Sequence, residues 1–244
     1  MTNHYNDEAF FEAYQEMDRS KFGLEGAGEW HELQKLLPDF QGMRVLDLGC
    51  GYGWHCRYAV AQGAVSVLGI DLSSKMLAKA RELTESSKIV YQELDLRQLE
   101  QLEGEFDVII SSLAFHYVED FHQIVTQVKR LLVPQGKFVF SVEHPVYTAE
   151  GRQEWCYDEG QLKHWPVDNY YIEGSRQSHF LGQDIVKYHK TLTTYLNTLL
   201  VNEFTLKQVV EPQPSQDKLA QIPEMKEELR RPMMLLVSAE TKAD

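Results

Sequence analysis

The sequence has few of the features that mark secreted, membrane and nucleic-acid-binding proteins. It contains only three cysteines, Cys50, Cys56 and Cys156, and these match no zinc or redox spacing, so we expect reduced thiols and no metal site. Its 24 Lys and Arg are outnumbered by 37 Asp and Glu, giving a formal net charge of -13, which argues against binding to a phosphate backbone. No apolar run is long enough to cross a bilayer, and the first eight residues are polar and acidic, unlike a targeting segment. We therefore expect a cytoplasmic monomer or homodimer that has no nucleic-acid or membrane partner.

An alternation of short apolar runs and helical stripes fills the region from Arg44 to Val142. The apolar runs predict strands at residues 45–48, 65–70, 89–91, 106–110 and 138–142, the last one entered by a turn at Pro134-Gln135-Gly136. Amphipathic helices are predicted between them, one at Trp54–Gln62, one capped by Ser73 and one capped by Asp120. Strands that are apolar on both faces and alternate with helices predict a doubly wound, mostly parallel α/β sheet, within a single domain spanning residues 1–244.

The segments on either side of this region have other patterns. Within residues 1–40 two helices are predicted, at Glu8–Met17 and Gly28–Leu37. Residues 144–189 follow the fifth strand, show no clear period and are rich in aromatic rings, so they predict either an inserted lid over a substrate or the core of a small subdomain. Beyond them we expect a helix bearing Leu192 to Leu200, strands at residues 204–210 and 233–237, and a long surface connection at residues 211–231.

A glycine-rich loop, Asp47-Leu48-Gly49-Cys50-Gly51-Tyr52-Gly53, follows the first predicted strand. Its glycines allow a tight turn and a close approach of the backbone to a ligand. Trp54 stands where a dinucleotide loop needs its third glycine, and the lysine of a phosphate loop is also missing. Asp71 and Asp95 end the next two predicted strands. Each of these acids alone could be a helix cap or a solvated side chain, but three carboxylates at neighbouring strand ends favour an adenosine ligand.

Five segments together resemble the successive motifs of the class I S-adenosylmethionine (SAM)-dependent methyltransferases, and most of all the small-molecule branch that includes the ubiquinone and menaquinone methyltransferases. They are residues 45–53, 69–73, 93–96, 106–117 and 131–138. The resemblance implies a Rossmann-like, seven-stranded sheet whose last strand inserts antiparallel, SAM as the cofactor and a small-molecule methyl acceptor.

The same resemblance implies which residues contact SAM. Asp71 would hold the ribose, Met76 and Leu96 would flank the adenine, and Asp95 would meet its amino group. Ser112 stands where many relatives have asparagine. The complete implied set is Tyr14, Asp47, Gly49, Cys50, Gly51, Asp71, Leu72, Met76, Asp95, Leu96, Ser112 and Leu113.

The methyl group of SAM is already electrophilic, so the protein has to align a nucleophile and, where needed, remove a proton. The candidates for proton removal are His116 first, then His144, Glu143 and His189, which each also have a structural interpretation as a packed, anchoring or capping side chain. Arg152, Arg176 and Lys187 could meet a substrate carboxylate or lie at the surface. Two other functions stay open: a SAM-binding protein without catalysis, and a nicotinamide-dependent oxidoreductase, which Trp54 disfavours.

Overall fold

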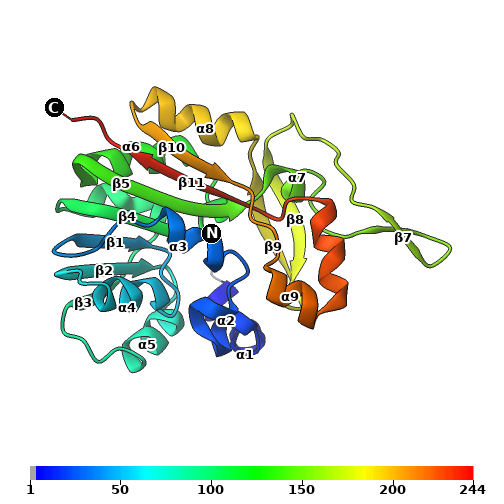
Figure 1. Ribbon diagram of the computed structural model, residues 1–244, viewed down its shortest axis with the longest axis horizontal. Helices are drawn as coiled ribbons and strands as arrows, with labels where there is room; N and C mark the ends of the chain where they lie inside the picture. The colour runs from blue at the N-terminus through cyan, green and yellow to red at the C-terminus, as the bar shows by residue number, and fades with distance from the viewer. Residues whose placement is uncertain (1–3, 244) are drawn as a thin grey trace.

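A seven-stranded sheet organises the protein, for which a computed structural model describes residues 4–243. Its strand order is β10-β11-β5-β4-β1-β2-β3 (Figure 1). The strands are β1 (Arg44–Leu48), β2 (Ser66–Asp71), β3 (Ile89–Glu93), β4 (Phe106–Ser112), β5 (Leu132–Glu143), β10 (Thr205–Val210) and β11 (Met234–Glu240). Neighbouring strands are parallel except where β11 pairs with β5 and β10. The predicted seven-stranded sheet with an antiparallel last strand is confirmed.

Helices cover both faces of this sheet because alternate strand residues are apolar on both sides. Val45 and Val67 pack against the helices α4 and α5, whereas Leu46 and Ile109 pack against α6 and α8. The covering helices are α3 (Trp30–Leu36), α4 (Trp54–Ala61), α5 (Ser74–Glu82), η3 (Leu96–Gln101), α6 (Phe121–Leu131) and α8 (Leu192–Val201). The predicted caps are confirmed, since the side chains of Ser73 and Asp120 accept the backbone N–H groups of Met76 and Gln123.

Three segments differ from their predictions. Strand β5 already begins at Leu132, so Pro134-Gln135-Gly136 forms an irregularity within the strand, with Gln135 at φ 60°, rather than a turn that precedes it. The connection at residues 211–231 contains α9 (Gln216–Gln221) and the 3-10 helix η5 (Pro223–Arg230). Near the amino terminus, α2 (Asp18–Lys21) and η2 (Gly23–Gly26) lie between the predicted helices α1 (Glu8–Gln15) and α3, after a first 3-10 turn η1 (His4–Asn6).

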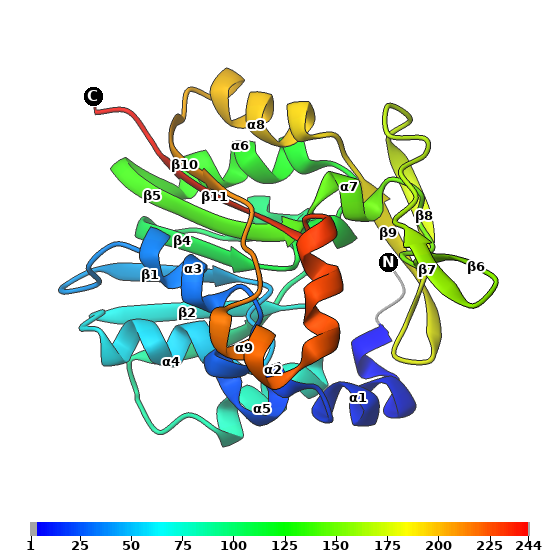
Figure 2. The same cartoon turned by 45° about the vertical axis from the view of Figure 1, so that its right-hand side comes forward.

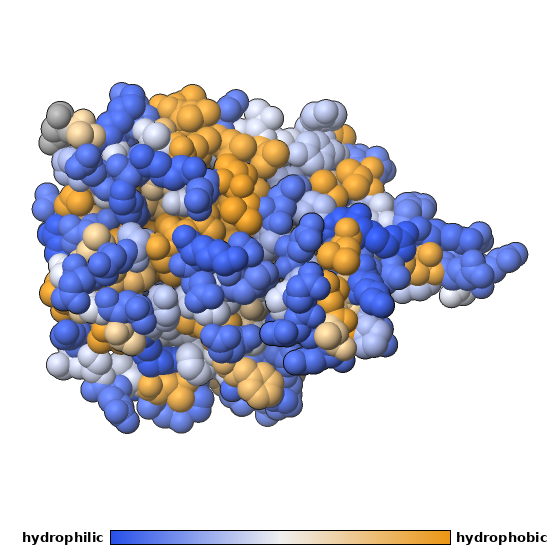
Figure 3. Space-filling model, in the orientation of Figure 1, coloured by the Kyte–Doolittle hydropathy of each residue, from blue (hydrophilic) through white to orange (hydrophobic). Residues whose placement is uncertain are grey.

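Residues 144–189, for which no regular structure was predicted, fold into a short helix and two hairpins. The elements are α7 (Pro145–Thr148), β6 (Cys156–Asp158), β7 (Gln161–His164), β8 (Gly174–Phe180) and β9 (Gln183–His189). Each hairpin turns through two residues with positive φ, Glu159-Gly160 and Leu181-Gly182, as tight hairpins require. The β6–β7 hairpin projects from the body, and its surface is mostly hydrophilic (Figure 3).

The hairpin β8–β9 and the N-terminal helices α1 and α2 lie at the same end of the sheet, where the parallel strands finish (Figure 2). This placement puts two segments far apart in sequence around the edge where doubly wound sheets bind their ligands. Within residues 4–243, no helix is both long enough and apolar enough to cross a membrane.

Candidate active site

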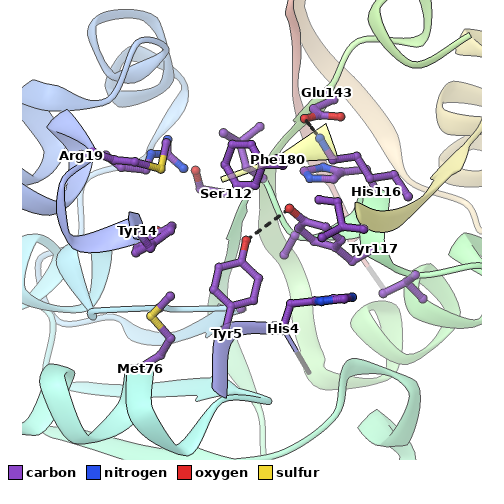
Figure 4. Close-up of a pocket in the computed structure, with 18 of the residues that line it drawn as sticks. His4, Tyr5, Tyr14, Arg19, Met76, Ser112, His116, Tyr117, Glu143 and Phe180 are labelled. Atoms are coloured by element: carbon purple, nitrogen blue, oxygen red, sulfur yellow. Dashed lines mark hydrogen bonds and ion pairs between the residues drawn. The ribbon is translucent and has the colours of Figure 1, made fainter. Parts of the chain in front are cut away.

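A cavity of about 850 Å³ lies at the carboxyl ends of the parallel strands. The N-terminal residues Tyr14 and Arg19 line one side of it, and His116, Tyr117 and Glu143 line the other (Figure 4). The predicted site residues that line it are Tyr14, Gly49, Gly51, Asp71, Leu72, Met76, Asp95, Leu96, Ser112, Leu113, His116 and Glu143. Asp47, Cys50, His144 and His189 do not line it.

The glycine loop is fixed to the end of β2. The N–H groups of Gly49 and Cys50 both donate to the carbonyl of Ile70 at 2.9 Å, and the N–H of Gly51 donates to Asp71 Oδ2 at 2.9 Å. Gly51 has φ 52°, and a Cβ added to it would meet no described atom within 4 Å. Gly51 is therefore the place where the loop opens toward a ligand, whereas a Cβ on Gly49 would lie 2.6 Å from Ala114 Cβ.

Asp71 supports the loop and faces the cavity at the same time. Its second oxygen, Oδ1, accepts the N–H of Ser73 at 2.8 Å. Burial raises the pKa of Asp71, and the backbone donors of Ser73 and Gly51 oppose that rise because they stabilise the carboxylate. The carboxylate thus ties the loop after β1 to the start of α5 while its edge lines the cavity.

Asp95 does not end β3, which finishes at Glu93, but caps η3 through the N–H of Arg97 at 2.9 Å. The Arg97 side chain also binds both carboxylate oxygens, with Nε 3.0 Å from each. These hydrogen bonds from Arg97 hold the pKa of Asp95 below its usual value. Asp95 still lines the cavity, as an ionised side chain that is already paired.

Asp47 and Cys50 support the loop from beneath instead of contacting the cavity. Asp47 lies inside β1 on the same face as Val45, toward α4, so its Oδ2 accepts from the Cys56 thiol at 3.2 Å. Burial raises the pKa of Asp47 to about 7. The Cys50 side chain packs into the core with Cys56 and Tyr91. Their prediction as cofactor contacts is not supported by these side-chain directions.

A second buried carboxylate, Glu29, organises the wall beside the loop after β4. Its Oε1 accepts from Arg19 Nη2 at 2.6 Å and from Ser112 Oγ at 3.0 Å. Leu113 has φ 52°, an uncommon value for leucine, and its N–H donates to the carbonyl of Ser141 at 2.9 Å. Neither Arg19 nor Glu29 was predicted from the sequence, because no local motif surrounds them.

His116 lies in the 3-10 turn η4 (Phe115–Tyr117) and is 2% exposed. Its Nδ1 is buried and has no hydrogen-bond partner among residues 4–243. Burial lowers the pKa of His116 to about 4, although the negative charge of Glu143 acts in the opposite direction. The imidazole is therefore neutral near pH 7, the form that can accept a proton.

Tyr117 connects the two walls of the cavity. Its hydroxyl accepts a hydrogen bond from the Tyr5 hydroxyl at 3.2 Å, and the Tyr5 ring lies between the His116 and Met76 sides of the site (Figure 4). The N-terminal segment therefore forms part of the cavity wall.

Glu143 at the end of β5 belongs to a buried network with Lys187 of β9 and Gln153. Lys187 Nζ donates to Glu143 Oε1 at 2.5 Å and to Gln153 Oε1 at 2.8 Å, while Gln153 Nε2 donates to Glu143 Oε2 at 2.6 Å. Burial alone would raise the pKa of Glu143. The His116 imidazole, when protonated, the positive charge of Lys187 and these hydrogen bonds together hold that pKa below its usual value. All three side chains line the cavity.

His144 and His189 do not line the cavity. In each of them, both nitrogens of the imidazole ring contact neighbouring groups of the protein. His144 is the N-cap of α7: its Nδ1 accepts the N–H of Val146 at 3.0 Å and its Nε2 lies 2.8 Å from Glu211 Oε1. His189 ends β9 and does not open α8; its Nε2 donates to the Tyr170 carbonyl at 2.9 Å, and its Nδ1 lies 2.8 Å from Thr148 Oγ1. Their side chains hold the inserted segment together, which corrects their prediction as proton acceptors.

The rings of the inserted segment divide between two positions. Tyr147, Phe180 and Tyr188 line the cavity. Tyr147 also stacks on Trp165 with the ring centres 4.9 Å apart, and the Arg231 guanidinium lies 4.2 Å from the Trp165 ring centre. Thus some rings face the cavity and others form a small core around Arg231. In the part of the chain from 4 to 243, no three His, Cys, Asp or Glu side chains are grouped so as to hold a metal ion.

The sheet order, the antiparallel β11 and the cavity bounded by the glycine loop and Asp71 together define the class I methyltransferase fold. Comparisons with known proteins agree. Residues 46–140 match the family described as "Methyltransferase domain". A crystal structure of a Listeria monocytogenes protein is 52% identical, has a TM-score of 0.85, and covers 90% of this chain and 99% of its own.

A second crystal structure, of an S-adenosylmethionine-dependent methyltransferase from Mesorhizobium loti, is 46% identical with a TM-score of 0.83 and covers 89% of this chain and 100% of its own. The ubiquinone biosynthesis O-methyltransferase of Dechloromonas aromatica is 37% identical over 103 residues. These residues make up 41% of this chain and 44% of that relative, so the match spans less than half of either protein. The chain belongs to the class I SAM-dependent methyltransferases. It is an enzyme whose methyl donor is SAM, which decides against both the oxidoreductase and the non-catalytic interpretation.

Proposed function

We propose that the protein methylates a hydroxyl group of a small molecule and that His116 receives the proton of that hydroxyl. The observation that carries this proposal is the neutral imidazole of His116, a residue that lines the cavity and whose buried Nδ1 has no hydrogen-bond partner among residues 4–243. The O-methyltransferase from Dechloromonas aromatica supports an oxygen acceptor by similarity. A cytoplasmic location and the absence of a nucleic-acid partner stay predictions from composition.

Contacts between segments across the cavity support a small acceptor. The N-terminal segment contacts the tip of the β8–β9 hairpin across the cavity: Gln183 Nε2 donates to Asp7 Oδ1 at 2.6 Å, and the rings of Phe10 and Phe180 lie 6.0 Å apart. On the other side, Asn6 Oδ1 accepts from Ser73 Oγ at 2.7 Å. A macromolecular acceptor would have to displace these contacts, whereas a small molecule fits beneath them.

The residues present fit SAM. Gly51 leaves open space where the backbone must approach the ligand, and Asp71 presents a carboxylate suited to ribose hydroxyls. Met76 and Leu96 are apolar side chains suited to flank an adenine, and the Arg19 guanidinium is suited to the methionine carboxylate. When bound, SAM supplies an electrophilic methyl group on its sulfonium.

His116 and Glu143 supply the proton chemistry on the acceptor side. The neutral imidazole can take a proton from the acceptor hydroxyl as its oxygen is methylated. The imidazolium formed would be buried, and the nearby Glu143 carboxylate would stabilise it. Because both oxygens of Glu143 are hydrogen-bonded and its pKa is lowered, Glu143 is suited to this electrostatic role rather than to taking the proton itself.

The test measures the S-adenosylhomocysteine released when the protein and SAM are incubated with a panel of small hydroxylated compounds. Once an acceptor is found, His116→Asn should lower kcat by about 100-fold or more, the contribution of a positioned general base, with little change in SAM affinity. The matched control is His122→Asn, at an exposed histidine of α6 that lies outside the cavity. A His116→Asn enzyme with the kcat of the control would refute the role of His116.

A further inference from the structure

Glu143, Lys187 and Gln153 form a closed, charge-balanced group on the acceptor side of the cavity. We infer that Glu143 and Lys187 set the acceptor specificity by neutralising each other, so that the enzyme selects an uncharged hydroxylated aromatic ring over its carboxylate- or ammonium-bearing analogues. This inference rests on the proposed function, because it describes the acceptor of the same site.

The hydrogen bonds within the group leave little capacity for a charged ligand. Both oxygens of Glu143 and both amide atoms of Gln153 are in use, and Lys187, which is 2% exposed, already donates twice. An acceptor carboxylate would therefore have to take Lys187 from Glu143, and an acceptor ammonium would have to take Glu143 from Lys187. Either exchange would leave one protein charge buried and unpaired, which is costly.

Most of the other charged groups that line the cavity are already paired or lie on the cofactor side. Of the rest, Asp18 is exposed, and the His4 ring contacts Gln183 at the tip of the hairpin. Arg19 lies across the cavity from this group, where it pairs with Glu29 and faces the proposed site of the methionine carboxylate, and Asp95 is paired with Arg97. Asp71 accepts backbone N–H groups at the end of β2, on the cofactor side. His116 is neutral, and His179 is exposed and bound to Asp184. Among the described lining residues near the hairpin, Glu143 and Lys187 thus provide the buried charges, and these cancel.

The apolar surface beside this group suits a planar ring. Tyr117, Tyr147 and Phe180 line the cavity together with Ile185 and Val186. Figure 4 shows Phe180 beside His116 and Glu143. Aromatic side chains bury a flat ring well, and a neutral ring loses little hydration on entering. A hydroxyl on that ring could then reach the imidazole of His116.

The experiment compares three ligands that share one ring: catechol, 3,4-dihydroxybenzoate and dopamine. Their affinities are measured by calorimetry with S-adenosylhomocysteine present at saturation, so no turnover is needed. The wild-type protein should bind catechol about tenfold or more tightly than either charged analogue, the size expected of one charge-assisted hydrogen bond. Binding of S-adenosylhomocysteine itself tests the cofactor site, so its failure would count against the proposed function and not against this specificity.

Single substitutions should redirect the preference. Glu143→Gln leaves Lys187 without its counter-charge and should raise the relative affinity for 3,4-dihydroxybenzoate by about tenfold or more, whereas Lys187→Met should do the same for dopamine. The matched controls are Glu240→Gln and Lys137→Met, which break an ion pair between β11 and β5 away from the cavity. These controls should leave the order of the three ligands unchanged.

The inference is overturned if the wild type binds a charged analogue as tightly as catechol, if it binds none of the three rings, or if folded single variants keep the wild-type order. Should the single variants fail to fold, the double variant Glu143→Gln/Lys187→Met removes both charges and should fold with the preference for catechol intact. A double variant that gains affinity for either charged analogue would equally contradict the inference.

Discussion

Replacing Asp71 by asparagine tests the cofactor site most sharply, because one carboxylate serves both the loop and the ligand. Asp71 accepts the N–H of Gly51 on one oxygen and the N–H of Ser73 on the other. In Asp71→Asn one of these oxygens becomes an amide that cannot accept, so one buried N–H loses its partner. This should cost about 1–3 kcal/mol of folding free energy. In the complex, the variant also loses charge-assisted hydrogen bonds to the ribose, worth about 1.5–3 kcal/mol each, so SAM affinity should fall by about tenfold to more than 100-fold.

The assay is calorimetric titration with SAM, accompanied by thermal unfolding to confirm that the variant is folded. Asp107→Asn is the matched control, since Asp107 also accepts a backbone N–H, that of Arg44 at 2.8 Å, and pairs with the Arg44 side chain. Asp107 lies at the start of β4, at the end of the sheet away from the cavity. The control should lose stability but keep its affinity for SAM. A folded Asp71→Asn protein that binds SAM within about twofold of the wild type would refute the assignment of the ribose site.

Two further predictions concern His116 and the glycine loop. The pKa of His116 is lowered to about 4 in the folded protein, from about 6.5 in the unfolded chain. Below pH 6.5 the unfolded chain therefore binds a proton that the folded protein does not. The free energy of unfolding that is fully present above pH 6.5 falls by about 3 kcal/mol as the pH approaches 4. Chemical denaturation should therefore show that His116→Asn loses less stability than the wild type between pH 7 and pH 4.5; equal losses would contradict the burial of a neutral imidazole. In the loop, Gly51→Ala should cost about 1 kcal/mol of stability for its positive φ and weaken SAM binding, because the new methyl group enters open cavity. Gly53→Ala would place a Cβ 2.0 Å from the Tyr91 hydroxyl, so thermal melting should show the larger destabilisation for that variant; the reverse order would count against the loop geometry.

The sheet was predictable because its signals are local. Each strand of the parallel region is a short apolar run, and caps such as Ser73 and Asp120 mark where the helices begin. The glycine loop and Asp71 follow directly from those strand ends. Each of these features depends on residues that are close together in the sequence, so the local sequence pattern is sufficient to predict its position.

The hairpins were missed because their turn and strand signals are weak. Glu159-Gly160 and Leu181-Gly182 form tight turns, although their first residues are not the asparagine or aspartate that usually marks such turns. In β9 the buried positions alternate correctly, but two of them, Lys187 and His189, are polar, which hides the period. Their burial depends on partners from distant segments, Glu143 and Thr148.

Side-chain direction explains the remaining errors at the site. His144 follows a strand that ends at the cavity, but its ring turns back to cap α7, and Asp47 lies within β1 facing α4. Arg19 lies at the cavity without any local motif. Position in the chain predicted which segments meet at this edge of the sheet, whereas contacts between distant segments decide which side chains face the ligand.

A crystal structure of the protein with S-adenosylhomocysteine would show directly whether the cavity at the strand ends is the SAM site. We predict that the ribose hydroxyls bind Asp71, that the amino-acid carboxylate lies against Arg19, and that the sulfur faces the side of the cavity that contains His116. A sulfur directed away from His116, or a ribose bound away from Asp71, would contradict these assignments of the cofactor and acceptor sides.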